Sequence, residues 1–318
     1  MVIDKNECVK LIRENEEFLV LSHEHPDGDT LGCAFALCEI LKILGKKRAF
    51  LCSDEVTADF SYMTDGFSAD EVKNPFVIAV DVADLKLLGS IAEEYKDKID
   101  LCIDHHMSNT FYAKNNFVED RAAACEIIYE LAVLMGVELN QYIRNCIYTG
   151  ISTDTGCFRY QNVTPSVFRV AAELMEQGVD SKKINKLMFE TKSKSSLRLE
   201  MIARETLEYH FDGKCAIITI TQDMYKKSGS NEHECYPITA LPRQIEGVLV
   251  GAVIKEKKDG SFGISVRTED GIDAAEICAR LGGGGHKGAA GSSFRETYEE
   301  GKKKLLDSIK ISLDGISK

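Results

Sequence analysis

The sequence lacks long apolar runs, paired cysteines and an excess of positive charge, and each absence excludes a class of protein. No apolar run approaches the roughly 20 residues that span a bilayer, and the N-terminus shows no signal-peptide pattern. The eleven cysteines form no Cys-x-x-Cys pair and are odd in number, which disfavours a disulfide framework or a zinc cage. We therefore expect a cytoplasmic protein with reduced thiols and no membrane partner.

Positive charge is scarce, because 39 Lys and Arg residues face 51 Asp and Glu residues and the net charge is −12. Binding to long nucleic acid depends on many contacts from Lys and Arg to phosphates, so we expect no such partner. A short phosphorylated substrate, held by metals and a few local cations, remains compatible with this charge. The 318 residues, 44% of them hydrophobic, are enough for two domains with cores of their own.

The first candidate functional residues follow a short apolar run at 18–21 that is typical of a buried strand. His23, Asp27 and Asp29 come after this run, and apolar residues return at helical spacing over 30–44. These polar residues are therefore expected on a strand-to-helix loop, where open α/β sheets build their sites. One imidazole and two carboxylates suit Mn²⁺, with Zn²⁺ or Mg²⁺ less favoured. The alternative is a solvated loop that caps the helix through Asp29.

Later in the chain, apolar elements again stop at carboxylates or imidazoles. They end at Asp81, at Asp104 with His105 and His106 behind it, and at Asp154. Strands and helices alternate through this half, which predicts an α/β domain with a parallel sheet and helices on both faces. Each carboxylate alone is equally compatible with a helix cap or a turn.

Gathered in one cleft, these carboxylates would repel one another and raise one another's pKa unless cations compensate. Two divalent metals resolve that conflict. They also bind a phosphoryl group, generate hydroxide at neutral pH and stabilise both the attacking and the leaving oxygen. The residues therefore indicate metal-assisted phosphoester hydrolysis.

The second half of the chain has a different pattern, with a hairpin turn expected at Asp259-Gly260. Its predicted strands are 214–220, 247–255 and 263–267. A helix over 273–281 leads into a glycine run, and a lysine-rich amphipathic helix closes the chain. We expect three parts: an N-terminal catalytic domain over 1–190, a linker or connecting helix over 191–210, and a smaller α/β domain with a mixed sheet over 211–318.

The glycine run consists of four consecutive glycines, 282–285, followed by His286. Without Cβ atoms, backbone N–H groups can approach an anion closely, in the manner of a nest. His286 adds a donor, and Arg267 on the preceding hairpin offers a bidentate phosphate contact. Arg159, in the first half of the chain, is a further candidate phosphate contact. The alternative is that the glycines form a flexible linker.

Taken in order, these motifs resemble those of the DHH phosphoesterases. They are His23-x-x-Pro26-Asp27-Gly28-Asp29, Asp81, Asp104-His105-His106 and Ser152-Thr153-Asp154-Thr155-Gly156. The glycine run, with Ala289-Ala290-Gly291 behind it, resembles the glycine-rich motif of the first type of DHH-associated domain. The resemblance covers nearly the whole chain. Length and order are closest to the nanoRNase subgroup, the oligoribonuclease and 3′-phosphoadenosine-phosphate phosphatases.

The resemblance implies two bound Mn²⁺ ions, with Mg²⁺ or another divalent cation as a substitute. The ligands of the first would be His23, Asp27 and Asp81. The ligands of the second would be Asp29, the shared Asp81, His105 and Asp154. Asp104 would fix the tautomer of an imidazole, and His106 would face the substrate phosphate or the leaving oxygen. His25 is assigned as a loop side chain by its spacing from the Pro-Asp-Gly-Asp motif.

The resemblance also implies a substrate and a reaction. The enzyme would hydrolyse short oligoribonucleotides to mononucleotides and remove the 3′-phosphate of adenosine 3′,5′-bisphosphate. The second domain would hold the 5′ end of the substrate. Its candidate contacts are Gly283, Gly284, Gly285, His286 and Arg267, with Arg159 from the first domain.

Three alternatives stay open at this point. One is a hydrolase of cyclic or linear dinucleotides in signalling, which would use the same metals. Another is an inorganic pyrophosphatase or polyphosphatase, which the glycine-rich domain disfavours. The third is an RNA-binding module without catalysis, which leaves the histidine and aspartate set unexplained. The sequence also leaves the oligomeric state open, with a homodimer as one option.

Overall fold

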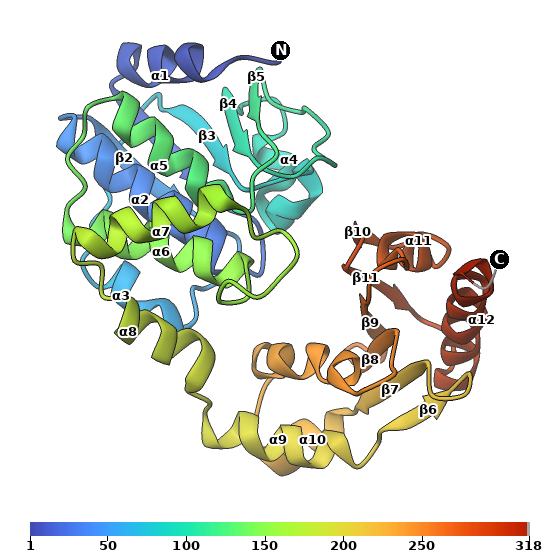
Figure 1. Cartoon of the computed structure of the whole chain (residues 1–318). Helices are drawn as coiled ribbons and strands as arrows, with labels where there is room; N and C mark the ends of the chain where they lie inside the picture. Colours follow the sequence, from blue (N-terminus) through green and yellow to red (C-terminus); the bar gives the residue numbers. More distant parts are fainter. Residues whose placement is uncertain (317–318) are drawn as a thin grey trace. The chain divides into compact units, whose positions relative to one another are not determined.

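The computed structural model describes residues 1–316, apart from the side chains of His233, Tyr236, Pro237, His286 and Ile316. The chain forms two compact units, Met1–Thr191 and a second one from Lys192 onward. Each has its own sheet and its own cores (Figure 1). No helix in the described part of the chain is long and apolar enough to cross a membrane.

The first unit is built on five parallel strands in the order β2-β1-β3-β4-β5. Their bounds are Glu17–Leu21 for β1, Lys47–Leu51 for β2, Phe76–Val80 for β3, Leu101–Asp104 for β4 and Asn115–Val118 for β5. All five strands end at the same edge of the sheet because they run in one direction. The residues that follow β1, β3 and β4 are therefore neighbours in space, since these strands lie side by side.

Helices cover both faces of this sheet unequally. Val20, Ile78 and Ile103 point into the larger core, which is closed by α1, α2, α5, α6 and α7. Figure 1 shows the longer of these helices as a layer across the sheet. The bounds are Lys5–Glu14 for α1, Gly28–Ile43 for α2, Ala124–Leu134 for α5, Gln141–Asp154 for α6 and Pro165–Glu176 for α7. Leu21 and Cys102 point to the opposite face.

That opposite face is closed by shorter elements, the 3-10 segment η2 (Leu85–Ile91) and α4 (Ala92–Tyr95). Leu88 of η2 is fully buried there. The remaining elements of the unit are η1 (Ala58–Phe60), α3 (Ser61–Thr64), α8 (Ser181–Asn185) and the π-helical η3 (Lys186–Glu190). The parallel α/β arrangement confirms the expected fold class of the first half.

Helices α2 and α6 approach each other closely because glycines line their contact. A Cβ on Gly28 would lie 2.4 Å from Oγ1 of Thr153. A Cβ on Gly32 would lie 2.5 Å from the carbonyl oxygen of Cys146. These contacts leave no room for a side chain. They bring the start of α2 beside the end of α6, which are the two helix ends that carry the predicted site residues.

The second unit contains a mixed six-stranded sheet in the order β10-β11-β9-β8-β7-β6, in which only β7 and β8 pair in parallel. Its strands are β6 (Glu208–His210), β7 (Cys215–Ile220), β8 (Val250–Glu256), β9 (Phe262–Thr268), β10 (Gly284–His286) and β11 (Ala289–Phe294). The expected hairpin is present as β8 and β9. The mixed sheet confirms the expectation for this half.

Both faces of the second sheet are covered as well. Ile217 and Val266 pack against α11 (Ala274–Ala279) and α12 (Tyr298–Ile316). Their neighbours Ile218 and Val253 point to the other face and pack against α9, α10 and η4. The bounds of these elements are Lys194–Arg204 for α9, Gln222–Ser228 for α10, His233–Ala240 for η4 and Pro242–Gln244 for the adjoining η5.

Two short strands and the glycine run differ from the sequence-based expectation. β5 contains only two apolar residues and β6 is three residues long, so neither has a recognisable pattern. The end of the glycine run is strand β10, not a free loop or linker. A Cβ on Gly283 would lie 2.1 Å from the carbonyl oxygen of Gly291, and Gly285 has a φ of 144°. Close pairing with β11 therefore requires glycine at these positions, whatever the run binds.

Candidate metal centre

The candidate centre lies at the edge of the first sheet where the strands end. His23 and Asp27 stand on the loop between β1 and α2, and Asp81 directly follows β3. His105 directly follows β4, and Asp154 is the last residue of α6. Four separate segments thus contribute to one site. The fold brings them together because β1, β3 and β4 are adjacent and α6 packs against α2.

Asp81 lies between two histidines. Its Oδ2 is 3.8 Å from Nε2 of His23, and its Oδ1 is 3.4 Å from Nε2 of His105. The side chain is only 3% exposed, and Oδ1 makes no hydrogen bond within the described part of the chain. The residue has a φ of 57°, a conformation that Asp and Asn tolerate better than most residues. A buried carboxylate oxygen without a hydrogen bond is costly unless a cation satisfies it.

The donor atoms of the six predicted ligands fall into two groups around Asp81. Nε2 of His23 is 3.8 Å from Oδ1 of Asp27. Nε2 of His105 is 3.9 Å from Oδ2 of Asp29 and 3.6 Å from Oδ2 of Asp154. Four triads in the described part of the chain have donor atoms within 4.8 Å of one another: His23 with Asp27 and Asp81, Asp29 with His105 and Asp154, Asp81 with His105 and His106, and Asp29 with Cys33 and Cys125.

Both histidines that face Asp81 are oriented through their other ring nitrogen. Nδ1 of His23 lies 2.7 Å from the carbonyl oxygen of Glu24, and Nδ1 of His105 lies 3.0 Å from that of Arg121. A carbonyl oxygen can only accept, so Nδ1 carries the hydrogen in each ring. The other nitrogen, Nε2, therefore faces the carboxylates in each ring. Metal-binding histidines commonly adopt this arrangement.

Asp104 and His106 form a hydrogen-bonded pair beside Asp81, and Nδ1 of His106 lies 3.4 Å from Oδ1 of Asp81. Nδ1 of His106 donates to Oδ1 of Asp104 over 2.8 Å, and the backbone N–H of His105 donates to the same oxygen at 2.8 Å. Asp104 is fully buried. Burial opposes its ionisation, but the hydrogen bond and charge of His106 prevail and lower the pKa of Asp104. The carboxylate thus fixes how the His106 ring is turned.

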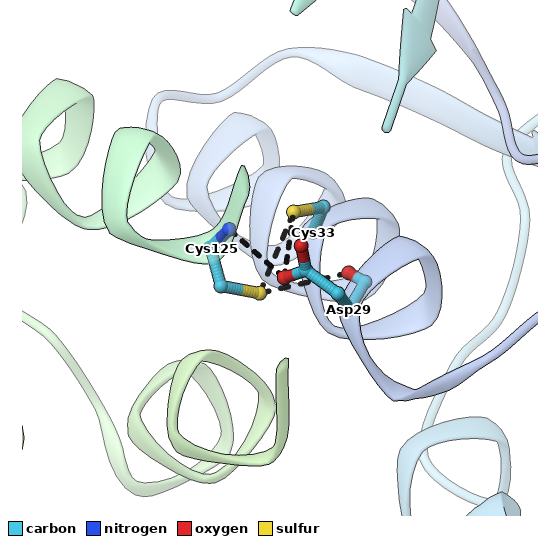
Figure 2. A group of neighbouring side chains, drawn as sticks. All are labelled: Asp29, Cys33 and Cys125. Carbon is cyan, nitrogen blue, oxygen red and sulfur yellow. Dashed lines mark hydrogen bonds between the residues drawn. The ribbon is translucent and has the colours of Figure 1, made fainter. Parts of the chain in front are cut away.

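Asp29 is held by the beginning of α5 (Figure 2). Its carboxylate accepts hydrogen bonds from the backbone N–H groups of Ala124 at 2.6 Å and Cys125 at 3.0 Å. The thiols of Cys33 and Cys125 lie 3.4 Å apart beside it. The alternative that Asp29 caps α2 is wrong, because Asp27 accepts the cap hydrogen bonds at the start of that helix. Asp29 is instead buried inside the first turn.

The electrostatics of these residues fit divalent cations. Burial, followed by the charge of Asp81, raises the pKa of Asp29, and burial and Asp29 raise that of Asp154. Burial disfavours protonated His23 and His105, yet the nearby carboxylates outweigh it and raise their pKa to about 10 and about 11. Without a cation, the site therefore retains protons to offset its carboxylates. Imidazole nitrogens and carboxylate oxygens together are donors that divalent metals accept.

Loading this centre with Mn²⁺ at pH 7 is expected to release more than one proton per chain. His23 and His105 have pKa values above 7 in the metal-free protein, whereas each must lose a proton for Nε2 to bind a cation. Titration calorimetry in two buffers of different ionisation enthalpy measures the number released. His23→Gln should lower it by about one, and His25→Gln should leave it unchanged, since His25 instead pairs with Asp54 on the surface. Proton-independent binding would contradict this expectation.

The remaining predicted residues lie elsewhere. Nε of Arg159 donates to the carbonyl oxygen of Gly156 at 2.6 Å, so this side chain supports the turn after α6. In the second unit, His286 pairs with Ala289, and Ala289 pairs with Arg267 on the next strand. The glycine run and Arg267 are thus brought into neighbouring strands of one sheet. The side chain of His286 lies outside the described residues.

Several contributors to the centre had not been expected from the sequence. Asn109 hydrogen-bonds Asp104, and the carbonyl of Arg121 holds His105. Neither contact follows from a spacing rule. Gly150 allows α6 to approach Asp29. The spacing of Gly28 and Gly32, one helical turn apart, is a signal of close helix packing that would have indicated the contact with α6.

Two family models match the chain. The N-terminal domain of the DHH family matches residues 17–151, and the DHHA1 domain matches residues 215–313. A relative from Thermus thermophilus, named bifunctional oligoribonuclease and PAP phosphatase NrnA, is 30% identical over 301 residues, covering 92% of this chain and 89% of the relative. Cyclic-di-AMP phosphodiesterase GdpP of Geobacillus thermodenitrificans is 24% identical, covering 96% of this chain and 49% of that protein.

Among solved structures, an exopolyphosphatase-related protein from Bacteroides fragilis is similar to this chain. The two match with a TM-score of 0.89 at 20% sequence identity, over 99% of this chain and 97% of the other. At this identity the likeness supports the fold alone.

Proposed function

Since the chain belongs to the DHH family, we propose that it is a two-metal phosphoesterase that hydrolyses short oligoribonucleotides to mononucleotides and removes the 3′-phosphate of adenosine 3′,5′-bisphosphate. The observation that carries the proposal is the position of Asp81 between His23 and His105, with one carboxylate oxygen toward each ring. The relative from Thermus thermophilus, whose name gives these two activities, supports the choice of substrate.

Each proposed cation site has its own set of ligands in the first unit. One would be held by His23, Asp27 and Asp81, and the other by Asp29, Asp81, His105 and Asp154. We propose Mn²⁺ for both, because imidazole and carboxylate ligands together suit it better than Mg²⁺. Two such cations, when bound, lower the pKa of a water molecule and offset charge on phosphoryl oxygens.

His106 is proposed to serve the leaving oxygen. Burial opposes protonation of this ring, but Asp104 and then the charge of Asp81 outweigh it and raise its pKa. Protonated His106 keeps its Nδ1 hydrogen on Asp104 and can give its Nε2 proton to the oxygen that departs from phosphorus. Asp104 therefore stabilises the protonated form and fixes the direction in which Nε2 points.

The second unit is proposed to hold the other phosphate of the substrate through Arg267 and the glycine run. Arg267→Ala should raise KM for a diribonucleotide about tenfold or more, since hydrogen bonds to charged groups contribute about 1.5–3 kcal/mol. It should change kcat by less than about threefold, because the residue acts in binding. Steady-state kinetics with Mn²⁺ measure both constants. Arg295→Ala is the matched control, because Arg295 is 82% exposed and pairs with Asp259.

The proposed function is tested by offering several substrates in parallel, each with Mn²⁺ and with a chelator. They are a 5′-labelled diribonucleotide, a five-nucleotide RNA, adenosine 3′,5′-bisphosphate and cyclic di-AMP. We expect metal-dependent release of mononucleotides, fastest from the shortest RNA, and release of phosphate from the bisphosphate. A protein that binds RNA and cleaves none of the four would be a binding module instead.

The second candidate function is hydrolysis of cyclic or linear dinucleotides in signalling. The likeness to cyclic-di-AMP phosphodiesterase GdpP favours it, and it would need the same metals. Cyclic di-AMP cleaved faster than the diribonucleotide would make this the main activity.

We place either activity in the cytoplasm. All eleven cysteines are free thiols and nine are buried, which suits a reducing compartment.

A further inference from the structure

We infer that Asn109 is a positioning residue for the phosphoester reaction, which acts through Asp104 on the orientation of His106. This inference rests on the proposed function, because it assigns His106 a role at the leaving oxygen. Within the described part of the chain Asn109 hydrogen-bonds none of the six candidate metal ligands, and by this assignment it does not contact the substrate. Asn109 would hold the carboxylate of Asp104, which in turn orients the imidazole of His106.

The carboxamide of Asn109 can adopt only one orientation. Its Oδ1 accepts the backbone N–H of Phe111 at 2.7 Å, so this end must be the oxygen. Its Nδ2 donates to Oδ2 of Asp104 at 2.6 Å and lies 3.3 Å from the carbonyl oxygen of Val82. The side chain is buried, with Asn109 only 5% exposed. The backbone N–H of Asn109 also donates to the carbonyl oxygen of His106 at 3.0 Å.

These contacts restrain both oxygens of Asp104. Oδ1 accepts from Nδ1 of His106, and Oδ2 accepts from Asn109. A carboxylate with a donor on each oxygen cannot turn about its terminal bond without losing one of them. Because Val82 directly follows Asp81, Asn109 also joins the segment that carries Asp81 to the segment that carries His106. The amide of Asn109 therefore contributes to the angle between the imidazole and the shared carboxylate, together with the backbone N–H of His105, which donates to Oδ1 of Asp104.

Asn109 also has a purely structural role, because its Oδ1 closes a turn to Phe111, which has a φ of 54°. Two substitutions separate the two roles. Asn109→Asp keeps an oxygen for the turn but replaces the donor with an acceptor facing Asp104. Asn109→Ala removes both the oxygen that accepts from Phe111 and the donor to Asp104. If the turn alone mattered, Asn109→Asp would behave like the unsubstituted protein.

Steady-state kinetics on a diribonucleotide at saturating Mn²⁺ provide the first test. We expect Asn109→Ala to lower kcat about 10- to 100-fold and to change KM less than about threefold. Losses of this size are typical of residues that hydrogen-bond a functional side chain and fix its orientation. Asn109→Asp should lower kcat at least as much. In an Asp104→Asn background, Asn109→Ala should change kcat less than about twofold. The two residues act through one hydrogen bond, so the effects of substituting them are not additive. Asn74→Asp, at an exposed position, is the matched control.

A second measurement does not depend on activity. The Nδ1 proton of His106 should give an exchange-protected signal in NMR spectra of the Mg²⁺-loaded protein. That signal should broaden or vanish in Asn109→Asp. Circular dichroism should show that this variant has the same fold as the unsubstituted protein. Wild-type kcat in Asn109→Asp, or fully additive losses in the Asp104→Asn background, would overturn the inference. If the unsubstituted protein cleaves no substrate, the proposed function fails, and the NMR signal still decides whether Asn109 orients His106.

Discussion

Asp81→Asn is expected to lower metal-dependent turnover by at least about a thousandfold while the protein stays folded. The substitution keeps the size of the side chain, and Asn tolerates the φ of 57° at this position. It removes the one carboxylate that faces both His23 and His105, and it introduces an N–H group where a cation would bind. Loss of a residue that merely orients a ligand costs 10- to 100-fold, so loss of a shared ligand should cost more.

Initial rates on a diribonucleotide at saturating Mn²⁺ measure this effect, and circular dichroism reports the fold. Asp65→Asn is the control, because it removes one negative charge from an exposed position outside the centre. Asp81→Ala is a poorer test, since a residue without a polar side chain at positive φ costs about 1–2 kcal/mol of stability. An Asp81→Asn variant that keeps a tenth of the wild-type rate would exclude Asp81 as a shared ligand.

Gly150→Ala is expected to lower both the stability of the protein and its affinity for Mn²⁺, although it adds only one methyl group. A Cβ at this position would lie 2.2 Å from Sγ of Cys125 and 2.5 Å from Oδ1 of Asp29. The added Cβ would also lie 2.9 Å from Cβ of Cys125, which cannot move away without moving α5. Overpacking of this kind costs about 1–3 kcal/mol, and we expect a value at the upper end. Displacement of Asp29 should also weaken Mn²⁺ binding.

Urea unfolding followed by circular dichroism measures the first effect, and calorimetric titration with Mn²⁺ measures the second. Gly66→Ala is the matched control, because no atom lies within 4 Å of its added Cβ and its φ is not positive. Gly66→Ala should have the urea midpoint and the Mn²⁺ affinity of the wild-type protein, or be slightly more stable. An unchanged midpoint and unchanged metal affinity in Gly150→Ala would show that α6 does not support Asp29 in the way described.

The sequence by itself determined the class of the fold and the order of its main elements. Apolar runs such as 18–21 and 76–80 are recognisable because a strand buried on both faces contains no polar residue. The run at 76–80 ends at Asp81, and a third run at 101–103 ends at the Asp104-His105-His106 motif. Short strands with little apolar character, such as β5, carry no comparable signal, because they are stabilised by their neighbours in the sheet.

Only the tertiary structure decided how the marked residues meet. The position of Asp81 between His23 and His105 follows from the order of β1, β3 and β4 in the sheet, which no local pattern encodes. The hydrogen bond from Asn109 to Asp104 likewise depends on the course of one loop. The physical reason is common to both cases. Periodicity along the chain reports which face of each element is buried, whereas contacts between elements depend on packing among residues far apart in the sequence.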